Sequence, residues 1–412
     1  MKLQSLETFI VGNPPPGFGG RYFVFVKLVT DCGIVGYGEI YGAAFGPKVI
    51  VAMAHDVFAR YLDGTDPFAT ETFFRRAHGS GFSQRPDPSM MGVASGLEMA
   101  MWDIVGKAVE RPVHALLGGK VHERLRSYTY LYPEEHEDPA AFYGDPDRAA
   151  ERAAAYVAEG FTAVKFDPAG PYSVHGGHLP DLETLDRSEA FCRQVREAVG
   201  SRADLLFGTH GQFSAEGALR LARRLERFDP LWFEEPVPPE MPEEMAKVAR
   251  GTSIPVATGE RLCTKWEFAR VLKTGAAGIL QMNLGRVGGI LEAKKITGMA
   301  EAWHAQIAPH LYCGPIVAAA NIQIAACSPN FLILESIRRF EGFHARILKR
   351  PLVWEDGYVT VPKAPGLGVE LDEAVALAHP YEGDELHLEM TQTPVDPARD
   401  ARFAPAGSTI SR

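Results

Sequence analysis

Cysteine is scarce in this sequence, and long apolar runs are missing. The five cysteines among 412 residues are scattered and form no CxxC pair: Cys32, Cys192, Cys263, Cys313 and Cys327. This spacing argues against a disulfide framework and against a zinc site, so we expect small buried thiols in a cytoplasmic protein. No apolar run approaches the roughly 20 residues that cross a bilayer, so we expect no membrane partner.

The chain also lacks an excess of basic residues. Its 42 Lys and Arg face 52 Asp and Glu, which gives a formal net charge of −10. A nucleic-acid partner is therefore not expected, because phosphate binding needs a basic surface. Residues 1–11 alternate polar and apolar side chains without the apolar core or cleavage site of a signal peptide, so they predict a strand.

The length and the pattern of elements predict two domains. A chain of 412 residues is too long for one compact core. Residues 1–125 predict an α+β domain, with strands over 2–11, 22–30 and 34–40 and a clear helix over 88–109.

From residue 126 the pattern changes to strand-like runs that alternate with helices, eight strands in all, the last over 331–334. Such alternation predicts parallel strands with crossover helices, and eight units predict a closed (β/α)8 barrel over 126–360. Residues 361–395 are expected to pack back on the first domain, and 396–412 to form a polar tail.

Two glutamates follow consecutive predicted strands of the barrel. Glu234 lies in Phe-Glu-Glu-Pro and Glu260 in Thr-Gly-Glu, and such strand ends meet at one mouth. Hard cations such as Mg²⁺ prefer carboxylate oxygens, although capping or ion pairing would also explain either residue. Where a third carboxylate is expected, at the end of the preceding strand, the sequence has Gly208.

Two histidines follow predicted strands of the same barrel. His210 lies two residues after Gly208, so both face the same way, although a lone histidine is more often a satisfied polar residue. His310 ends the seventh strand and is able to take and give a proton near neutral pH. Asn283 ends the strand before it and can orient the imidazole, but supplies no charge.

Other polar residues near strand ends, and one loop, are further candidates for the site. Lys165 and Asp167 end the second strand and serve either as an acid, a base or a substrate anchor, or as a structural ion pair. Glu335 closes the eighth strand and, if protonated, can donate to a developing enolate. The Gly- and Pro-rich loop 12–20, with Arg21 and Tyr22, is either a lid that sets substrate choice or an ordinary surface loop.

The order and spacing of these segments resemble the enolase superfamily, in its mandelate racemase/muconate lactonizing enzyme subgroup. The likeness is greatest to acid-sugar dehydratases of the D-galactonate dehydratase type. It covers nearly the whole chain and rests on residues 97–107, 116–119, 207–212, 232–236, 259–261, 279–289, 308–315 and 365–370. The resemblance implies an α/β fold, with an α+β capping domain built from both chain ends over a modified (β/α)8 TIM barrel. It also implies a Mg²⁺ cofactor, an acid-sugar substrate and a homo-oligomer.

The resemblance further implies roles for individual residues. His310 would be the general base, His210 the acid for a leaving hydroxyl, and Glu335 the hydrogen-bond donor to an enediolate. Glu234 and Glu260 would be the second and third metal ligands.

The sequence departs from the family pattern at three positions. The first metal aspartate corresponds to Gly208, for which His210 or Asp167 are candidate substitutes. The aspartate behind the base corresponds to Asn283, and the second lysine of a Lys-x-Lys motif corresponds to Asp167.

Three functions are compatible with this pattern. The first is β-elimination of water from an aldonate or aldarate through a Mg²⁺-assisted enediolate. The second is a racemase, epimerase or cycloisomerase that uses the same intermediate. The third is a non-catalytic paralogue that binds sugar acids, which Gly208 and Asn283 would explain.

Overall fold

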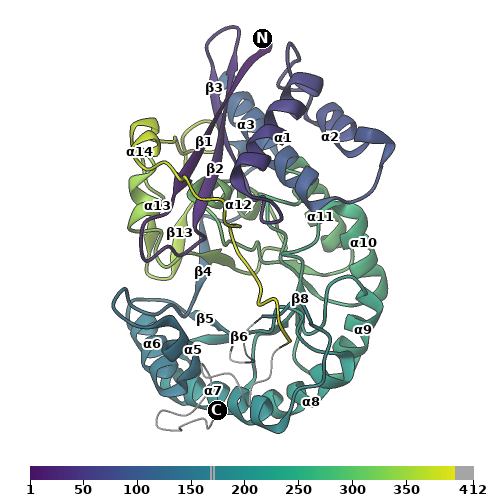
Figure 1. Ribbon diagram of the computed structural model, residues 1–412, viewed down its shortest axis with the longest axis vertical. Coiled ribbons are helices and arrows are strands. Elements are labelled where there is room, and N and C mark those ends of the chain that lie inside the picture. Colours follow the sequence, from purple (N-terminus) through teal and green to yellow (C-terminus); the bar gives the residue numbers. More distant parts are fainter. Residues whose placement is uncertain (168, 170–171, 395–412) are drawn as a thin grey trace. The chain divides into compact units, whose positions relative to one another are not determined.

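The computed structural model describes residues 1–394 apart from 168 and 170–171 (Figure 1). The tail predicted over 396–412 lies outside these residues. The described chain forms two compact units. The first comprises Met1–Arg126, Gly259–Ala269 and Leu280–Leu388, and the second comprises Ser127–Thr258, Arg270–Ile279 and the described residues from Glu389 onward. None of the helices in the described part of the chain has the length and apolarity to cross a membrane.

The first unit begins with an antiparallel sheet of three strands, drawn in purple in Figure 1: β1 (Leu3–Gly12), β2 (Tyr22–Thr30) and β3 (Val35–Ile40). The register pairs Val11 with Phe23 and Val24 with Ile40. β2 is central and nearly all of its side chains are buried, as expected for a strand that is covered on both faces.

Helices follow this sheet in the first unit: α1 (Pro47–Tyr61), α2 (Thr70–His78), the short 3-10 turn η1 (Ser80–Phe82), α3 (Pro88–Ala108) and α4 (Val113–Leu116). Asp87 caps α3 by accepting from the backbone N–H groups of Ser89 and Met90, and Pro88 occupies the first turn. α3 packs closely on β3, since a Cβ on Gly38 would lie 1.9 Å from the carbonyl oxygen of Gly96. Only glycine permits this approach.

The later part of the first unit alternates short strands and helices: α11 (Ile290–Ala302), β10 (Gln306–Ile307), α12 (Pro315–Ala326), β11 (Leu334–Ser336), α13 (Phe343–Arg346), β12 (Trp354–Glu355), β13 (Tyr358–Thr360) and α14 (Glu373–Ala378). The last barrel strand, β11, begins three residues later than the predicted 331–334 and overlaps it at Leu334. Residues of the C-terminal segment pair with β1, because the N–H of Gly12 donates to His379 O at 2.8 Å and that of Tyr381 to Ile10 O at 3.0 Å.

The second unit contains parallel strands that alternate with helices: α5 (Pro139–Gly144), α6 (Pro146–Ala158), β5 (Ala163–Phe166), α7 (Leu182–Val199), β6 (Asp204–Gly208), α8 (Ala215–Leu225), β7 (Trp232–Glu234), α9 (Pro242–Gly251) and β8 (Val256–Thr258), with 3-10 turns η2 (Gly200–Arg202) and η3 (Glu226–Phe228). β5 pairs with β6, β6 with β7 and β7 with β8. Three elements continue from one unit into the other: β4 (Arg124–Tyr130), α10 (Thr264–Thr274) and β9 (Ile279–Leu280).

Two buried carboxylates of the first unit cap helices that lie far away in the sequence. Glu39 in β3 accepts from the N–H groups of Gly314 at 2.5 Å and Val317 at 3.0 Å, at the start of α12. Glu98 in α3 accepts from Ile290 N–H at 2.6 Å and Leu291 N–H at 2.9 Å, at the start of α11. Negative charge is favourable at a helix N-terminus, but burial raises the pKa of each carboxyl to about 7.

This pKa shift predicts a pH-dependent stability difference between the parent and Glu39→Gln. The pKa of Glu39 in the folded protein lies above its ordinary value, so its stabilising contribution is complete below pH 4.5 and is lost as the pH rises through about 7. The variant should therefore gain on the parent by up to about 1.4 kcal/mol per pH unit across this window. Denaturant unfolding at pH 5, 6, 7 and 8 measures the difference.

The exposed Glu301 of α11 provides a matched control. Glu301→Gln should follow the pH profile of the parent. A constant difference between Glu39→Gln and the parent at all four pH values would contradict the assignment to Glu39.

Candidate active site

Polar side chains of the second unit gather at the carboxyl ends of β5, β6 and β7. The parallel register aligns Lys165 with Leu206 and Gly208 with Glu234. Asp167 directly follows β5, and His210 lies two residues after the end of β6. Since the carboxyl ends of neighbouring parallel strands share one edge, these residues form one cluster.

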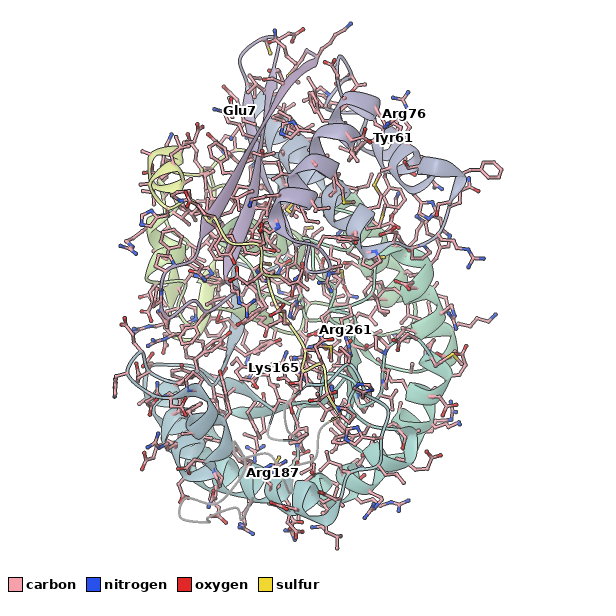
Figure 2. The ribbon with its side chains drawn as sticks, viewed as in Figure 1. Glu7, Tyr61, Arg76, Lys165, Arg187 and Arg261 are labelled. Carbon is pink, nitrogen blue, oxygen red and sulfur yellow. The ribbon has the colours of Figure 1, made fainter. Side chains whose placement is uncertain are left out.

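A buried ion pair joins the first and third of these strands. Lys165 Nζ lies 2.5 Å from Glu234 Oε1, and the two side chains are 3% and 2% exposed. Trp232 Nε1 donates to the other oxygen, Oε2, at 3.0 Å. Both oxygens of Glu234 are thus engaged, which a buried carboxylate requires. Figure 2 shows Lys165 among the strands of this unit.

Asp167 forms a second charged contact in the same cluster. Its Oδ2 lies 2.8 Å from His210 Nδ1, and its side chain is fully buried. Asp167 Oδ1 accepts from the N–H of Ala169 at 3.2 Å, and the Tyr172 hydroxyl also bonds to the carboxyl. Burial raises the pKa of Asp167, although the bond from His210 opposes this.

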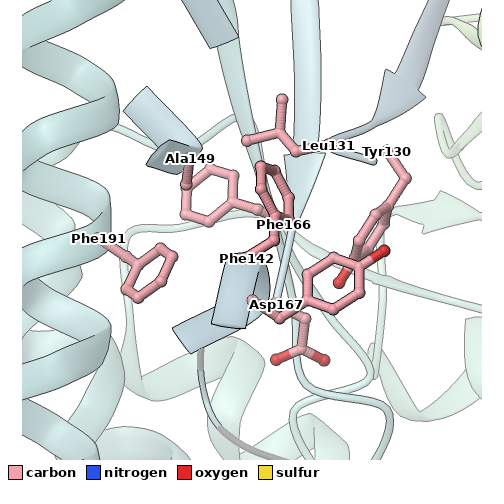
Figure 3. A pocket seen from close by; sticks show the side chains of 8 residues that line it. Tyr130, Leu131, Phe142, Ala149, Phe166, Asp167 and Phe191 are labelled. Atoms are coloured by element: carbon pink, nitrogen blue, oxygen red, sulfur yellow. The ribbon is translucent and has the colours of Figure 1, made fainter. Parts of the chain in front are cut away.

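Aromatic rings lie beside Asp167. A pocket beside it is lined by Tyr130, Leu131, Phe142, Tyr143, Ala149, Phe166, Asp167 and Phe191, and Figure 3 shows the Asp167 carboxylate next to these rings. Such apolar walls lower the local dielectric and strengthen the contact between Asp167 and His210.

His210 is held in an uncommon backbone conformation. Its φ of +46° lies in the left-handed region, which is rare for residues other than glycine. The Tyr172 ring lies 3.9 Å from the imidazole, centroid to centroid. The side chain is 21% exposed, so the imidazole is partly accessible. Strained residues of this kind cluster at functional sites.

Gly208 leaves room for a side chain. A Cβ at this position would lie 3.7 Å from Lys165 Cε and 3.8 Å from Asp167 Oδ2, which are ordinary contacts. The backbone and its neighbours therefore do not require a glycine at residue 208.

In the first unit, His310 lies among two carboxylates and an amide. Its Nε2 is 3.4 Å from Glu260 Oε2 and 3.9 Å from Glu335 Oε2, and its Nδ1 is 2.9 Å from Asn283 Nδ2. The imidazole is 8% exposed. Glu335 Oε2 also accepts from the N–H of Leu311 at 2.8 Å.

The contacts of Asn283 define which way its amide points. Its Oδ1 accepts from the N–H of Gly285 at 2.8 Å, and its Nδ2 also approaches Cys313 Sγ at 3.8 Å. A flipped amide would bring its NH₂ group against the Gly285 donor. The NH₂ group therefore faces His310.

The expected substrate residues near loop 12–20 differ in exposure. Arg21 is exposed and donates to Leu386 O at 3.1 Å. Tyr22 is only 2% exposed, and its ring packs 4.7 Å from that of Tyr381. Asn13 fixes the loop, because its Nδ2 donates to the carbonyls of Phe18 and Gly20.

No sequence pattern singles out His387, which lies close to this part of the first unit. It is 6% exposed and contacts the rings of Tyr22, Tyr41 and Tyr312 edge-on. Burial, with a smaller effect from Arg286, lowers the pKa of His387 to about 3, so the imidazole is neutral. Such a histidine lies far along the chain from every motif, which is why periodicity does not reveal it.

Two family models together match most of the chain. Residues 18–118 match the mandelate racemase/muconate lactonizing enzyme N-terminal domain, and residues 148–375 match the enolase C-terminal domain-like family. The chain therefore belongs to the mandelate racemase/muconate lactonizing enzyme family of the enolase superfamily. Its fold is an N-terminal capping domain with a C-terminal (β/α) barrel, which confirms the predicted fold class.

Particular relatives carry more specific names. The chain is 34% identical over 392 residues to a D-galactonate dehydratase of Ralstonia nicotianae, covering 92% of this chain and 94% of the relative. It is 32% identical over 408 residues to a D-xylonate dehydratase of Haloferax volcanii, covering 94% and 95%. A crystal structure from Labrenzia alexandrii DFL-11, described as a mandelate racemase/muconate lactonizing enzyme, is 66% identical with a TM-score of 0.94, covering 96% of this chain and all of that one.

The described residues do not fit the metal site expected from the family, whose members generally use Mg²⁺. Nowhere in the described ranges do three or more His, Cys, Asp or Glu side chains gather as metal ligands. The first ligand position is Gly208, and both oxygens of Glu234 already accept from Lys165 and Trp232. A Mg²⁺ site would need a further carboxylate and a displaced ammonium.

Restoring the carboxylate at residue 208 should therefore restore metal affinity. Gly208→Asp places the new carboxylate beside Lys165 without a backbone clash, and a further charge about 4 Å from a cation contributes up to roughly 4 kcal/mol at an effective dielectric of 20. We expect at least about a tenfold tighter Mg²⁺ dissociation constant, measured by calorimetric titration. Gly208→Asn adds the volume without the charge. Equal affinities in the two variants would contradict this prediction.

The buried pair predicts an asymmetric effect on stability. Lys165→Met leaves Glu234 without its ammonium partner and should lower the free energy of unfolding by about 3–5 kcal/mol. Adding Glu234→Gln removes the unpaired charge and should recover most of that loss. Guanidinium unfolding of the parent, single and double variants measures both effects, and a fully stable Lys165→Met protein would refute the pairing.

Proposed function

We propose that this protein is an acid-sugar dehydratase. It is an enzyme of the hydro-lyase class that removes water from an aldonate or aldarate. The observation that carries the proposal is the match, over more than nine-tenths of the chain, to two curated acid-sugar dehydratases. The two histidines support it, since each is hydrogen-bonded at Nδ1 and suited to proton handling.

The proposed reaction has two bond-breaking steps. The proton α to the carboxylate moves to a histidine, and its electron pair forms an enediolate. The β-hydroxyl then leaves with a proton as water, and the enol becomes a 2-keto-3-deoxy acid. Substrate and products differ only by water, so the reaction needs no oxidant or reductant.

Charge on the enediolate must be stabilised. Glu335, held by the N–H of Leu311, is the proposed donor to it, and the Lys165 ammonium is the proposed cation for a substrate carboxylate. Arg21 is proposed to contact a carboxylate of the substrate, and Asp167 is proposed to contact a hydroxyl group. No step is assigned to Mg²⁺, because the described donors do not form a site for it.

A two-base racemase that uses a lysine as one of its bases is less well supported. The second lysine of the family's Lys-x-Lys motif is Asp167 here, and this carboxylate is bonded to His210. Asp167 thus stands where the second lysine base would be, and this change leaves dehydration possible.

A screen of aldonates and aldarates tests the proposal. Purified protein with Mg²⁺ present should convert at least one acid sugar to a 2-keto-3-deoxy product, detected as its semicarbazone. His210→Gln should lower kcat by about 10²-fold or more, because it removes a proton-transfer group. Glu216→Gln, at an exposed position of α8, serves as the control. Solvent deuterium entering the α-position without a keto product would instead indicate an isomerase.

A further inference from the structure

Arg286 of the first unit is a cation that lacks an acidic partner among the described residues. It lies in the turn between β9 and α11 and is partly exposed. Its Cζ lies 4.3 Å from the centroid of the Tyr41 ring, and its Nη1 donates to the backbone oxygen of Glu260 at 3.4 Å. The Glu260 carboxylate approaches His310 instead, with Oε2 3.4 Å from Nε2. No carboxylate in the described part of the chain forms an ion pair with Arg286.

The stacking on Tyr41 leaves the donors of Arg286 available. A guanidinium has five N–H groups in one plane, and the Glu260 carbonyl occupies one of its nitrogens. An aromatic ring against the flat face holds the group in place and does not block its edge. Two parallel N–H groups on such an edge match the two oxygens of a carboxylate. Arg286 is thus oriented to bind a carboxylate.

Tyr41 and His387 add two buried polar groups without normal partners. Tyr41 is 5% exposed, and none of the described residues hydrogen-bonds to its hydroxyl. His387 is 6% exposed, and neither ring nitrogen has a hydrogen bond of normal geometry within the described ranges, although the Gly19 carbonyl lies near the ring. An unpaired buried group costs about 1–3 kcal/mol, and native proteins pair nearly all of them. Two such groups beside one cation therefore point to a ligand that accepts hydrogen bonds.

Tyr41 lies at the centre of these groups, all of which belong to the first unit. His387 meets the Tyr41 ring edge-on at 5.1 Å between centroids, and the His310 ring lies 6.3 Å from it. Burial raises the pKa of Tyr41 and lowers that of His387, and Arg286 is the charge that acts most on each. The charge of Arg21 acts on His387 as well. Both rings stay neutral at physiological pH, so each has a proton to donate beside the guanidinium.

We propose that Arg286, Tyr41 and His387 form a carboxylate-binding subsite beside His310. The edge of Arg286 supplies two N–H donors, and the Tyr41 hydroxyl and the His387 imidazole are further donors to the same group. The inference rests on the proposed function only for the source of the carboxylate, which is an acid sugar. A neutral sugar has no group that would balance the charge of Arg286.

Nitrogen NMR of the full-length protein detects this binding without turnover. Labelling with ¹⁵N-histidine gives ring signals for the 13 histidines, and His387→Gln identifies those of His387. Added D-galactonate should shift the His387 signals. Galactitol, which has a hydroxymethyl group in place of the carboxylate, should leave them unchanged, as should sodium chloride at the same concentration. Unshifted His387 signals with galactonate, or equal shifts with either control, would overturn the proposal.

Substitution of Arg286 tests the anchor. Arg286→Gln removes a charged contact with two hydrogen bonds and should weaken galactonate binding by about 10–100-fold, measured from the His387 shifts. Arg286→Lys keeps the stacked cation without the planar edge, so it should lose less affinity and remains informative if Arg286→Gln does not fold. Circular dichroism checks the fold of each variant.

Arg124→Gln is the matched control, because the exposed guanidinium of Arg124 lies 3.9 Å over the Tyr358 ring in the same unit. It should bind galactonate like the parent. Parental affinity in both folded Arg286 variants would refute the role of Arg286.

Kinetics with an acid sugar found in the screen distinguish the subsite from the proposed function. Arg286→Gln should raise KM by about 10–100-fold and change kcat only by about a few-fold, because a contact made equally in the ground and transition states affects binding alone. A lower kcat at unchanged KM would overturn the assignment of Arg286 to binding. Carboxylate-dependent shifts of His387 without any turnover in the screen would support the subsite and count against dehydration.

Discussion

Burial of charge at the strand ends is the constraint on which the candidate site depends. An ammonium or carboxylate loses several kcal/mol of hydration when water is removed, so each one needs a partner in place. In the second unit Lys165 satisfies Glu234, and His210 satisfies Asp167. Each partner comes from a different strand, so the contacts tie β5 to β7 and β5 to the loop after β6. The same side-chain contacts therefore hold these strands together and form the candidate site.

Two of the departures from the family pattern, at Gly208 and Asp167, lie next to each other. A carboxylate is missing at Gly208, yet one is present at Asp167, and a Cβ at Gly208 would lie 3.8 Å from Asp167 Oδ2. A carboxylate is also missing behind His310, where Asn283 stands, while His210 has acquired one. Taken singly, each change suggests decay of the site. Together, Gly208 and Asp167 place the negative charge beside His210 instead of at the end of β6.

The sequence predicted the arrangement of elements better than the contacts of the site. Strong alternation and glycine turns predicted β1–β3, α3 and the strands of the second unit to within a few residues. The start of the last strand was predicted three residues early, because Phe331–Leu334 is more apolar than the observed β11. The sequence alone left open whether Lys165 and Asp167 pair with each other or serve the site. The answer depends on their partners, because Lys165 contacts Glu234, 69 residues away, and Asp167 contacts His210, 43 residues away. The orientation of the Asn283 amide depends on one backbone donor and leaves no trace in the sequence pattern.

The capping of α11 and α12 bears on whether the two segments that the family models match can be separated. Both helices begin on carboxylates, Glu98 and Glu39, that come from the first hundred residues of the chain. A fragment that begins after residue 126 would expose two bare helix starts and the apolar face that α3 covers. The segments that family models divide into two domains are thus joined by hydrogen bonds as specific as those inside either one. Recombination of this capping region with a related barrel would succeed only where both carboxylates recur.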